Sequence, residues 1–232
     1  MNFLERLFGI DLKTFLLSLP IILIALVVHE VSHGYIAMKL GDPTARNLGR
    51  LTLNPLKHLD PIGTVCMVLF HFGWAKPVPI NTRYFKKPKR DMALTALAGP
   101  VSNFIMGLGG VLVYRILLAV FTAVVKPSTS DFAVSMMGTT LDFFSLFAIL
   151  NISLGVFNLI PVPPLDGSRI LFVFLPSKAY FSVMKYERYI MLGFFVLLFV
   201  GRRTGIVGSI LSAPVNWIWS GMNWLIGLIP GL

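Results

Sequence analysis

The sequence has few charged residues and a single cysteine. Charged side chains make up 13% of its 232 residues, whereas apolar side chains make up 56%. A soluble domain usually has about 25% charged residues, so a water-exposed surface over most of the chain is excluded. The lone Cys66 excludes an internal disulfide framework and a thiolate metal cluster. Residues 1–30 also lack a short apolar core followed by a small-residue cleavage site, so no removable signal peptide is expected.

Long apolar runs make up most of the sequence. A hydrocarbon core roughly 30 Å thick is crossed by about 20 apolar residues of helix. The sequence therefore predicts an all-α, multi-pass integral membrane protein with about five or six transmembrane helices in one bundle. We expect residues 1–232 to form one membrane-embedded domain. Its predicted parts are an interfacial helix at 1–14, a catalytic core at 15–175 and C-terminal membrane helices at 176–232.

The net charge of +10 predicts a contact with lipid headgroups rather than with nucleic acid. The basic residues stand in short joints between apolar runs and not on one polar, aromatic-rich face. Those that follow the first run outnumber Arg6 and Lys13 before it, so the positive-inside rule places the end of that run in the cytosol. The following group consists of Lys39, Arg46, Arg50 and Lys57.

Residues 59–74 are apolar but short, and residues 74–81 have prolines at alternate positions, which forbids a helix there. Basic clusters bracket this region. If both clusters face the cytosol, the stretch between them dips into the membrane and returns, and an irregular backbone at that depth needs protein or a wet cavity around it. We therefore expect a re-entrant region beside a functional site.

The chemistry is indicated most clearly by His29-Glu30-Val31-Ser32-His33, an H-E-x-x-H pattern in an apolar run that is predicted to be helical. Residues four apart share a helix face, so both imidazoles can bind one Zn²⁺ while Glu30 reaches a water molecule. The alternative, polar side chains that reach the interface from a helix end, would leave three ionisable groups without compensating charge deep in the run.

A catalytic zinc usually has a third protein ligand. The candidates are His58, His71, Asp142 and Asp166. Asp166 stands out because it follows the break made by Pro161, Pro163 and Pro164. The residues alone leave two interpretations of Asp166 equally open: a metal ligand, or an ordinary N-cap of the helix that resumes nearby.

The segments HEVSHG, GRLTLNPLKHLDPIGT, FGWAKPVPIN, AGPVSN and NLIPVPPLDG together resemble the site-2 protease family, in particular its compact bacterial and archaeal members. The resemblance implies a prokaryotic cell membrane, transmembrane protein or peptide substrates, and one Zn²⁺ bound by His29, His33 and Asp166. It also implies Glu30 as general base and acid, Asn103 near the site, and an embedded β-hairpin formed by residues 46–53 and 74–81. No insertion is long enough for the PDZ domain of larger relatives.

The predicted function is hydrolysis of peptide bonds in or near transmembrane segments by a metal-activated water. Asn103 is compatible with two roles, an amide that stabilises an oxyanion or one that ties two membrane helices together. A metal carrier and a catalytically silent scaffold are the competing classes. Glu30 argues against a carrier, because transport needs no carboxylate beside the ligands. The oligomeric state stays open.

Overall fold

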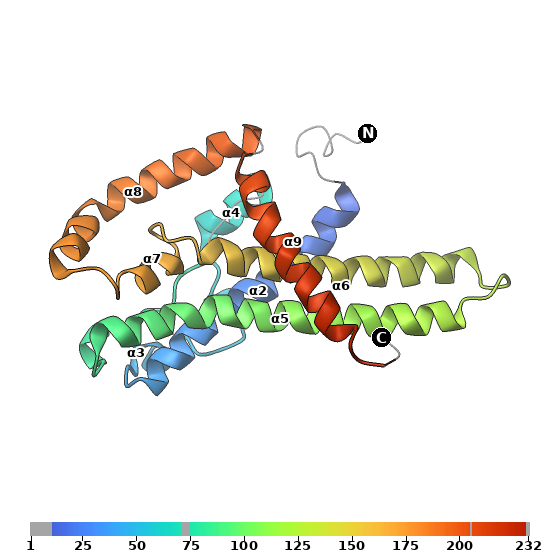
Figure 1. Ribbon diagram of the computed structural model, residues 1–232, viewed down its shortest axis with the longest axis horizontal. Coiled ribbons are helices and arrows are strands. Elements are labelled where there is room, and N and C mark those ends of the chain that lie inside the picture. The colour runs from blue at the N-terminus through green and yellow to red at the C-terminus, as the bar shows by residue number, and fades with distance from the viewer. Residues whose placement is uncertain (1–10, 71–74, 205, 231–232) are drawn as a thin grey trace.

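The structure is a computed structural model that describes residues 11–70, 75–204 and 206–230 (Figure 1). These residues form helices joined by turns, with one isolated antiparallel bridge between Leu59 and Ala75. In chain order the helices are α2 (Leu12–Lys39), α3 (Thr44–Asn47), η1 (Pro55–Lys57), α4 (Pro61–Phe70), η2 (Thr82–Tyr84), α5 (Pro88–Val124), α6 (Asp131–Asn158), α7 (Asp166–Leu171), α8 (Ser177–Thr204) and α9 (Ile206–Ile226).

Helices α2, α5 and α6 are long and apolar enough to cross a membrane, which confirms an all-helical membrane fold within the described residues. The predicted count of about five or six spans is not confirmed, because among the described residues only these three helices meet that requirement. Most of the interfacial helix expected at 1–14 lies outside the described residues. Residues 12–14 belong to α2, whose N-cap Asp11 accepts a hydrogen bond from the Thr14 N–H at 2.9 Å.

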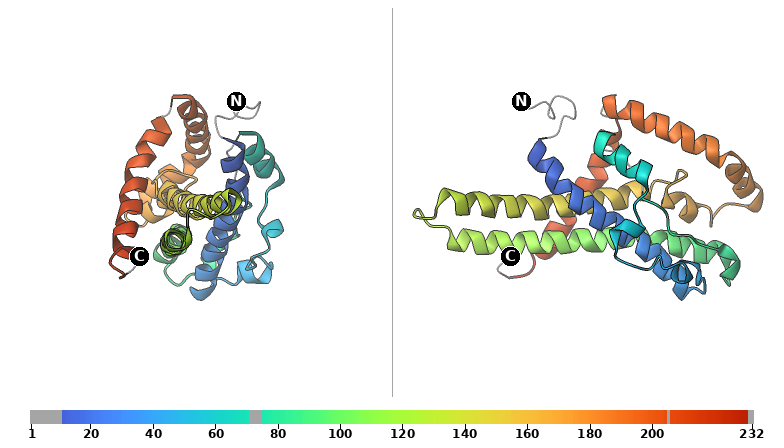
Figure 2. Two further views of the ribbon diagram at one scale, coloured as in Figure 1. Left: turned by 90° about the vertical axis from the view of Figure 1, so that its right-hand side faces the viewer. Right: turned by 180° about the vertical axis from the view of Figure 1, so that it is seen from behind.

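Helices α5 and α6 form a long antiparallel hairpin, and α2 packs across α5 (Figure 1). Helix α9 crosses both helices of the hairpin, where Val111, Ala148 and Ile226 form a buried cluster. The view from behind shows the C-terminal end of α2 and the N-terminal end of α5 at the same end of the molecule (Figure 2). Helix α5 therefore lies at the centre of the bundle.

Small residues allow α5 and α6 to approach closely. A Cβ atom on Gly110 would lie 2.9 Å from Phe147 Cδ1 and 3.0 Å from Ala148 Cβ, and one on Gly107 would lie 2.9 Å from Ile152 Cγ1. In a membrane, helices associate through such close van der Waals contact, because lipid tails are as apolar as the side chains themselves. These glycines fix the separation of the two helices.

The predicted β-hairpin is not confirmed. Arg46 and Asn47 belong to α3, no strand forms in the described residues, and the single bridge between Leu59 and Ala75 lies outside residues 46–53. Residues 75–81 form no helix, and Pro77 and Pro79 favour an extended backbone there. The backbone groups of this segment bond to side chains and to one carbonyl instead of to a partner strand. Residues 71–74, the last part of the apolar stretch 59–74 that is expected to be re-entrant, lie outside the described residues, while residues 61–70 form helix α4.

We predict that Gly110→Leu destabilises the fold, because its side chain would overlap Phe147 and Ala148. The expected cost is about 1–3 kcal/mol, the range for overpacked cores. The measurement is the midpoint of thermal unfolding of the purified protein in detergent. Gly109→Leu is the matched control, since a Cβ on Gly109 meets nothing within 4 Å. Equal midpoints for the two variants would contradict the proposed role of Gly110.

Candidate metal centre

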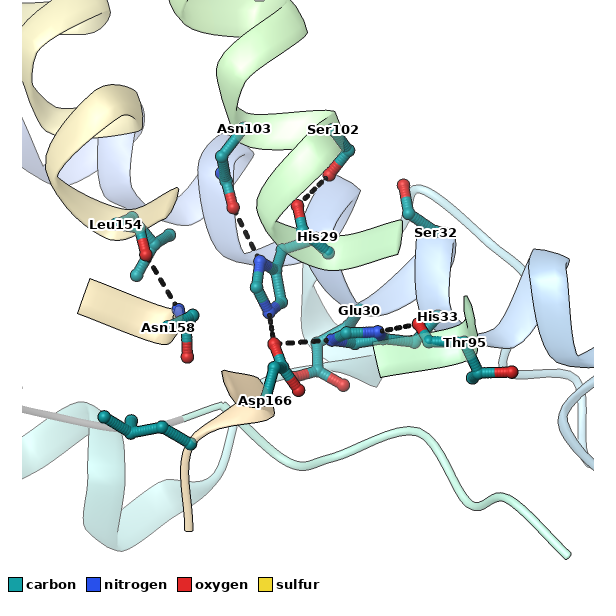
Figure 3. A network of polar contacts seen from close by, with 12 residues as sticks. His29, Glu30, Ser32, His33, Thr95, Ser102, Asn103, Leu154, Asn158 and Asp166 are labelled. Carbon is teal, nitrogen blue, oxygen red and sulfur yellow. Dashed lines mark hydrogen bonds and ion pairs between the residues drawn. The ribbon is translucent and has the colours of Figure 1, made fainter. Parts of the chain in front are cut away.

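Two helices, α2 and α7, bring two imidazoles and a carboxylate together. His29 and His33 project from the same face of α2, and Asp166 is the first residue of α7, which follows the proline-rich turn after α6. Figure 3 shows the three side chains pointing toward one another. Their potential ligand atoms all lie within 4.8 Å of one another. Both histidines are buried, at 4% and 7% exposure.

The distances fit a tetrahedral ion. Asp166 Oδ2 lies 3.1 Å from His29 Nε2 and 3.2 Å from His33 Nε2. Ligands at the usual zinc distances would be roughly 3.3 Å apart along a tetrahedron edge. The distances from Asp166 Oδ2 to the two imidazoles therefore match two edges of a zinc-sized coordination shell, and the three ligand atoms all lie within 4.8 Å of one another.

Hydrogen bonds on the far side of each ring fix the tautomer. His29 Nδ1 lies 2.6 Å from Asn103 Oδ1, and His33 Nδ1 lies 2.7 Å from the carbonyl oxygen of Thr95 (Figure 3). Both partners are hydrogen-bond acceptors, so each Nδ1 carries the proton and each Nε2 directs a lone pair at Asp166. Such partners typically orient the imidazole ligands of metals.

The three ligand atoms need a cation between them. Two Nε2 lone pairs and a carboxylate oxygen are all acceptors, and acceptors at these distances repel unless a proton or a metal ion lies between them. The donor set of two imidazoles and a carboxylate suits Zn²⁺, which would supply that positive charge when bound.

The other candidates for a third ligand lie elsewhere. His58 is buried with its Nε2 atom 2.8 Å from the Thr52 carbonyl oxygen, and Asp142 forms an ion pair with Lys13 at 2.6 Å. His71 lies outside the described residues. The N-cap interpretation of Asp166 is wrong, because Leu165 is the N-cap of α7 and the Asp166 side chain faces the histidines.

Glu30 lies between the two histidines in sequence and faces a different partner. Its Oε2 atom accepts a hydrogen bond from the backbone N–H of Val78 at 2.8 Å. Val78 belongs to the extended residues 75–81, which therefore contact α2 beside the His-His-Asp group. The carboxylate of Glu30 is not a member of that group, so it is available for proton transfer.

Asn103 is fully buried, and its whole amide is engaged. Its Oδ1 atom faces His29, while its Nδ2 atom donates to Asn151 Oδ1 at 3.1 Å and lies 3.5 Å from the Ala25 carbonyl oxygen. The amide thus joins α2, α5 and α6. The oxyanion role predicted as one possibility is not supported, because the Nδ2 protons are directed at protein acceptors.

The sequence did not identify Gly99 as a residue of the metal centre. A Cβ atom at this position of α5 would lie 2.5 Å from His29 Cε1 and equally close to His33 Cε1 and Nε2. Only glycine leaves room for both rings against the α5 backbone. The signal was present in Gly99-Pro100, since a glycine in a membrane helix often marks a close approach. The Thr95 carbonyl and the Val78 N–H are backbone groups and have no sequence signature.

The comparisons with known proteins identify a family of zinc metalloproteases. The model of peptidase family M50 matches residues 17–201. YwhC of Bacillus subtilis, provisionally named a zinc metalloprotease, is 40% identical over 200 residues, which cover 84% of this chain and 87% of YwhC. Zinc metalloprotease MJ0392 of Methanocaldococcus jannaschii is 30% identical over 158 residues, which cover 68% of this chain and 34% of that protein.

Rip2 of Mycolicibacterium smegmatis, also provisionally named a zinc metalloprotease, is 28% identical over 153 residues, which cover 62% of this chain and 52% of Rip2. The chain thus spans most of YwhC, about half of Rip2 and a third of MJ0392. No solved structure matches the chain. The chain belongs to peptidase family M50, the site-2 protease family of membrane-embedded zinc metalloproteases, with Zn²⁺ as the implied cofactor.

Proposed function

We propose that this metalloprotease hydrolyses peptide bonds in or near the transmembrane segments of membrane proteins, with His29, His33 and Asp166 as the zinc ligands. The observation that carries the proposal is the convergence of these three ligand atoms within 4.8 Å of one another. The group sits roughly 26 Å along α2 from its start, well inside an apolar helix. A protease centre at that position meets substrates inside the membrane.

Each residue has a distinct task in this proposal. Zn²⁺ held by the three ligands would polarise the substrate carbonyl and lower the pKa of a water molecule to about 7. The Glu30 carboxylate takes a proton from the attacking water and then gives it to the leaving amine. Neither carrier nor scaffold needs such a base next to the ligands, so Glu30 supports hydrolysis.

Asn103 is proposed as a positioning residue. Its Oδ1 atom holds the Nδ1 proton of His29, while its Nδ2 atom anchors the amide to Asn151. The His29 ring is therefore fixed in rotation and in tautomer by a group that never meets the substrate. Loss of partners of this kind typically weakens metal binding about 10–100-fold.

The substrate would have to unwind before cleavage, because a helix hides its carbonyls in its own hydrogen bonds. Glycine and proline weaken helices, so substrates that contain them near the cleaved bond should be cut faster than a uniform poly-Leu helix. Single-span membrane proteins with a locally weak helix are therefore the substrate class that fits best.

The centre is proposed to lie toward the cytosol. The C-terminal end of α2 carries Lys39 and is followed by Lys57, and the start of α5, which lies nearby in Figure 2, is preceded by Lys86 and Lys87. The opposite end of the α5–α6 hairpin has Lys126 and Asp131. The positive-inside rule then puts the basic end in the cytosol.

We predict that Glu30→Gln keeps zinc but loses proteolysis by about 10²–10⁴-fold, the usual contribution of a general base. His33→Ala and Asp166→Asn should instead lose zinc. The measurements are zinc content by mass spectrometry and cleavage of a single-span substrate in detergent, with and without a chelator. Asp142→Asn is the control, since its carboxylate pairs with Lys13 and not with the centre. Proteolysis that survives complete removal of zinc would refute the proposal.

Gly99→Ala should reduce zinc affinity at least about tenfold, because the added methyl displaces both imidazoles. Equilibrium competition with a chromophoric chelator measures this affinity without reference to catalysis. Gly109→Ala, in the same helix with open space around the position, is the matched control. Normal zinc affinity in Gly99→Ala would show that the rings do not depend on this contact.

For orientation, we predict that a cysteine at exposed position 57 is protected from an impermeant thiol reagent in intact cells and labelled in inverted vesicles. The variant is Lys57→Cys with Cys66→Ser. Lys126→Cys in the same background, exposed at the other end of the bundle, should give the reverse pattern. Labelling of position 57 in intact cells would place the centre on the outer side.

A further inference from the structure

Residues 77–79 have an unusual distribution of hydrogen-bond donors. Pro77 and Pro79 have no backbone N–H, so Val78 is the one donor of this tripeptide. That N–H donates to Glu30 Oε2 at 2.8 Å. Among the described residues it is the one hydrogen-bond donor to the Glu30 carboxylate. The Val78 N–H therefore contacts the Glu30 carboxylate, which transfers protons in the proposed function.

The backbone on both sides of Val78 is held in place by other elements. On one side, the Lys76 N–H donates to the His58 carbonyl oxygen and the Lys76 carbonyl accepts from Arg50 Nη2, both at 2.7 Å. On the other side, the Asn81 N–H donates to Asp42 Oδ2 at 2.7 Å. Arg50 and Asp42 are buried, at 8% and 0% exposure. These hydrogen bonds fix the position of the extended segment and therefore of the Val78 N–H.

The Val78 side chain holds the segment against α2. It is 6% exposed, and its Cγ1 atom fills the space that Gly34 leaves, where a Cβ would lie 2.9 Å away. Gly34 and Glu30 are four residues apart and share one face of α2. The side chain and the N–H of Val78 therefore contact neighbouring turns of the helix that supplies the metal ligands.

A glutamate needs such support for efficient proton transfer. Its side chain has several rotatable bonds, and a catalytic carboxylate works best when it is held in the productive geometry before the reaction. We propose that the Val78 N–H is a positioning group of the active site, which holds the Glu30 carboxylate in place for proton transfer. This inference rests on the proposed role of Glu30.

Two substitutions separate the N–H from the rest of Val78. Val78→Pro removes the N–H, and because Pro79 already restricts residue 78 to extended conformations, proline is compatible with the local backbone. Val78→Ala keeps the N–H and removes most of the side chain. If Val78→Pro does not fold, replacing Val78 by α-hydroxyvaline exchanges only the N–H for an oxygen. Each protein is purified at full length in detergent and loaded with zinc.

Loss of a charge-assisted hydrogen bond should lower kcat about tenfold to a hundredfold in Val78→Pro and in the α-hydroxyvaline protein. Zinc content and KM should stay within about twofold of the parent, since the N–H donates to Glu30 and not to a metal ligand. Val78→Ala keeps the N–H but loses part of the packing against α2, so its kcat should fall clearly less than that of the two proteins without the N–H. A labelled single-span peptide should bind equally well to Glu30→Gln with and without Val78→Pro.

Parent-like kcat in both proteins that lack the N–H would overturn the inference, as would an equal loss in Val78→Ala. A raised KM together with weaker peptide binding in the Glu30→Gln background would show that the N–H binds substrate instead. Failure of the proposed function is recognised separately. In that case Glu30→Gln itself would remain active, whatever the Val78 variants do.

Discussion

Polar groups inside an apolar bundle must be bonded on every side, and this requirement organises the centre of the molecule. His29, His33 and Asp166 converge among membrane helices, where an unpaired ionisable group is expensive. Each imidazole has an acceptor behind it, at Asn103 or at the Thr95 carbonyl, and the carboxylate in front. A cation between the three potential ligand atoms would complete the arrangement. The close packing of α2 on α5 follows from it, because the two rings fill the space above Gly99.

What the sequence predicts well is local. The four-residue spacing of His29 and His33 defines a helix face wherever a helix forms, and the proline break before Asp166 predicts a carboxylate free of α6. Helices α2, α5 and α6 follow from long apolar runs. The contacts that a motif cannot specify are those of backbone groups from distant segments, such as the Thr95 carbonyl and the Val78 N–H.

The predicted β-hairpin shows the same difference between local features, which the sequence predicts, and contacts between distant segments, which it does not. Alternating prolines correctly indicate a non-helical segment at 75–81. The resemblance suggests a partner strand, but side chains provide most of the hydrogen bonds that such a strand would make. Arg50 bonds to the Lys76 carbonyl, Glu30 to the Val78 N–H and Asp42 to the Asn81 N–H. Whether a buried side chain or a neighbouring strand saturates a backbone group is decided by tertiary packing, which the pattern of residues does not reveal.

The two prolines also affect the other edge of this segment. In an extended chain, successive residues direct their N–H and C=O groups to opposite edges, so the edge opposite Val78 offers the carbonyls of Pro77 and Pro79 and no donors from these residues. A stray β-strand needs both donors and acceptors to add there in register. This edge therefore offers no pattern of donors and acceptors that a β-strand of another chain could match, which lowers the tendency of the protein to self-associate there.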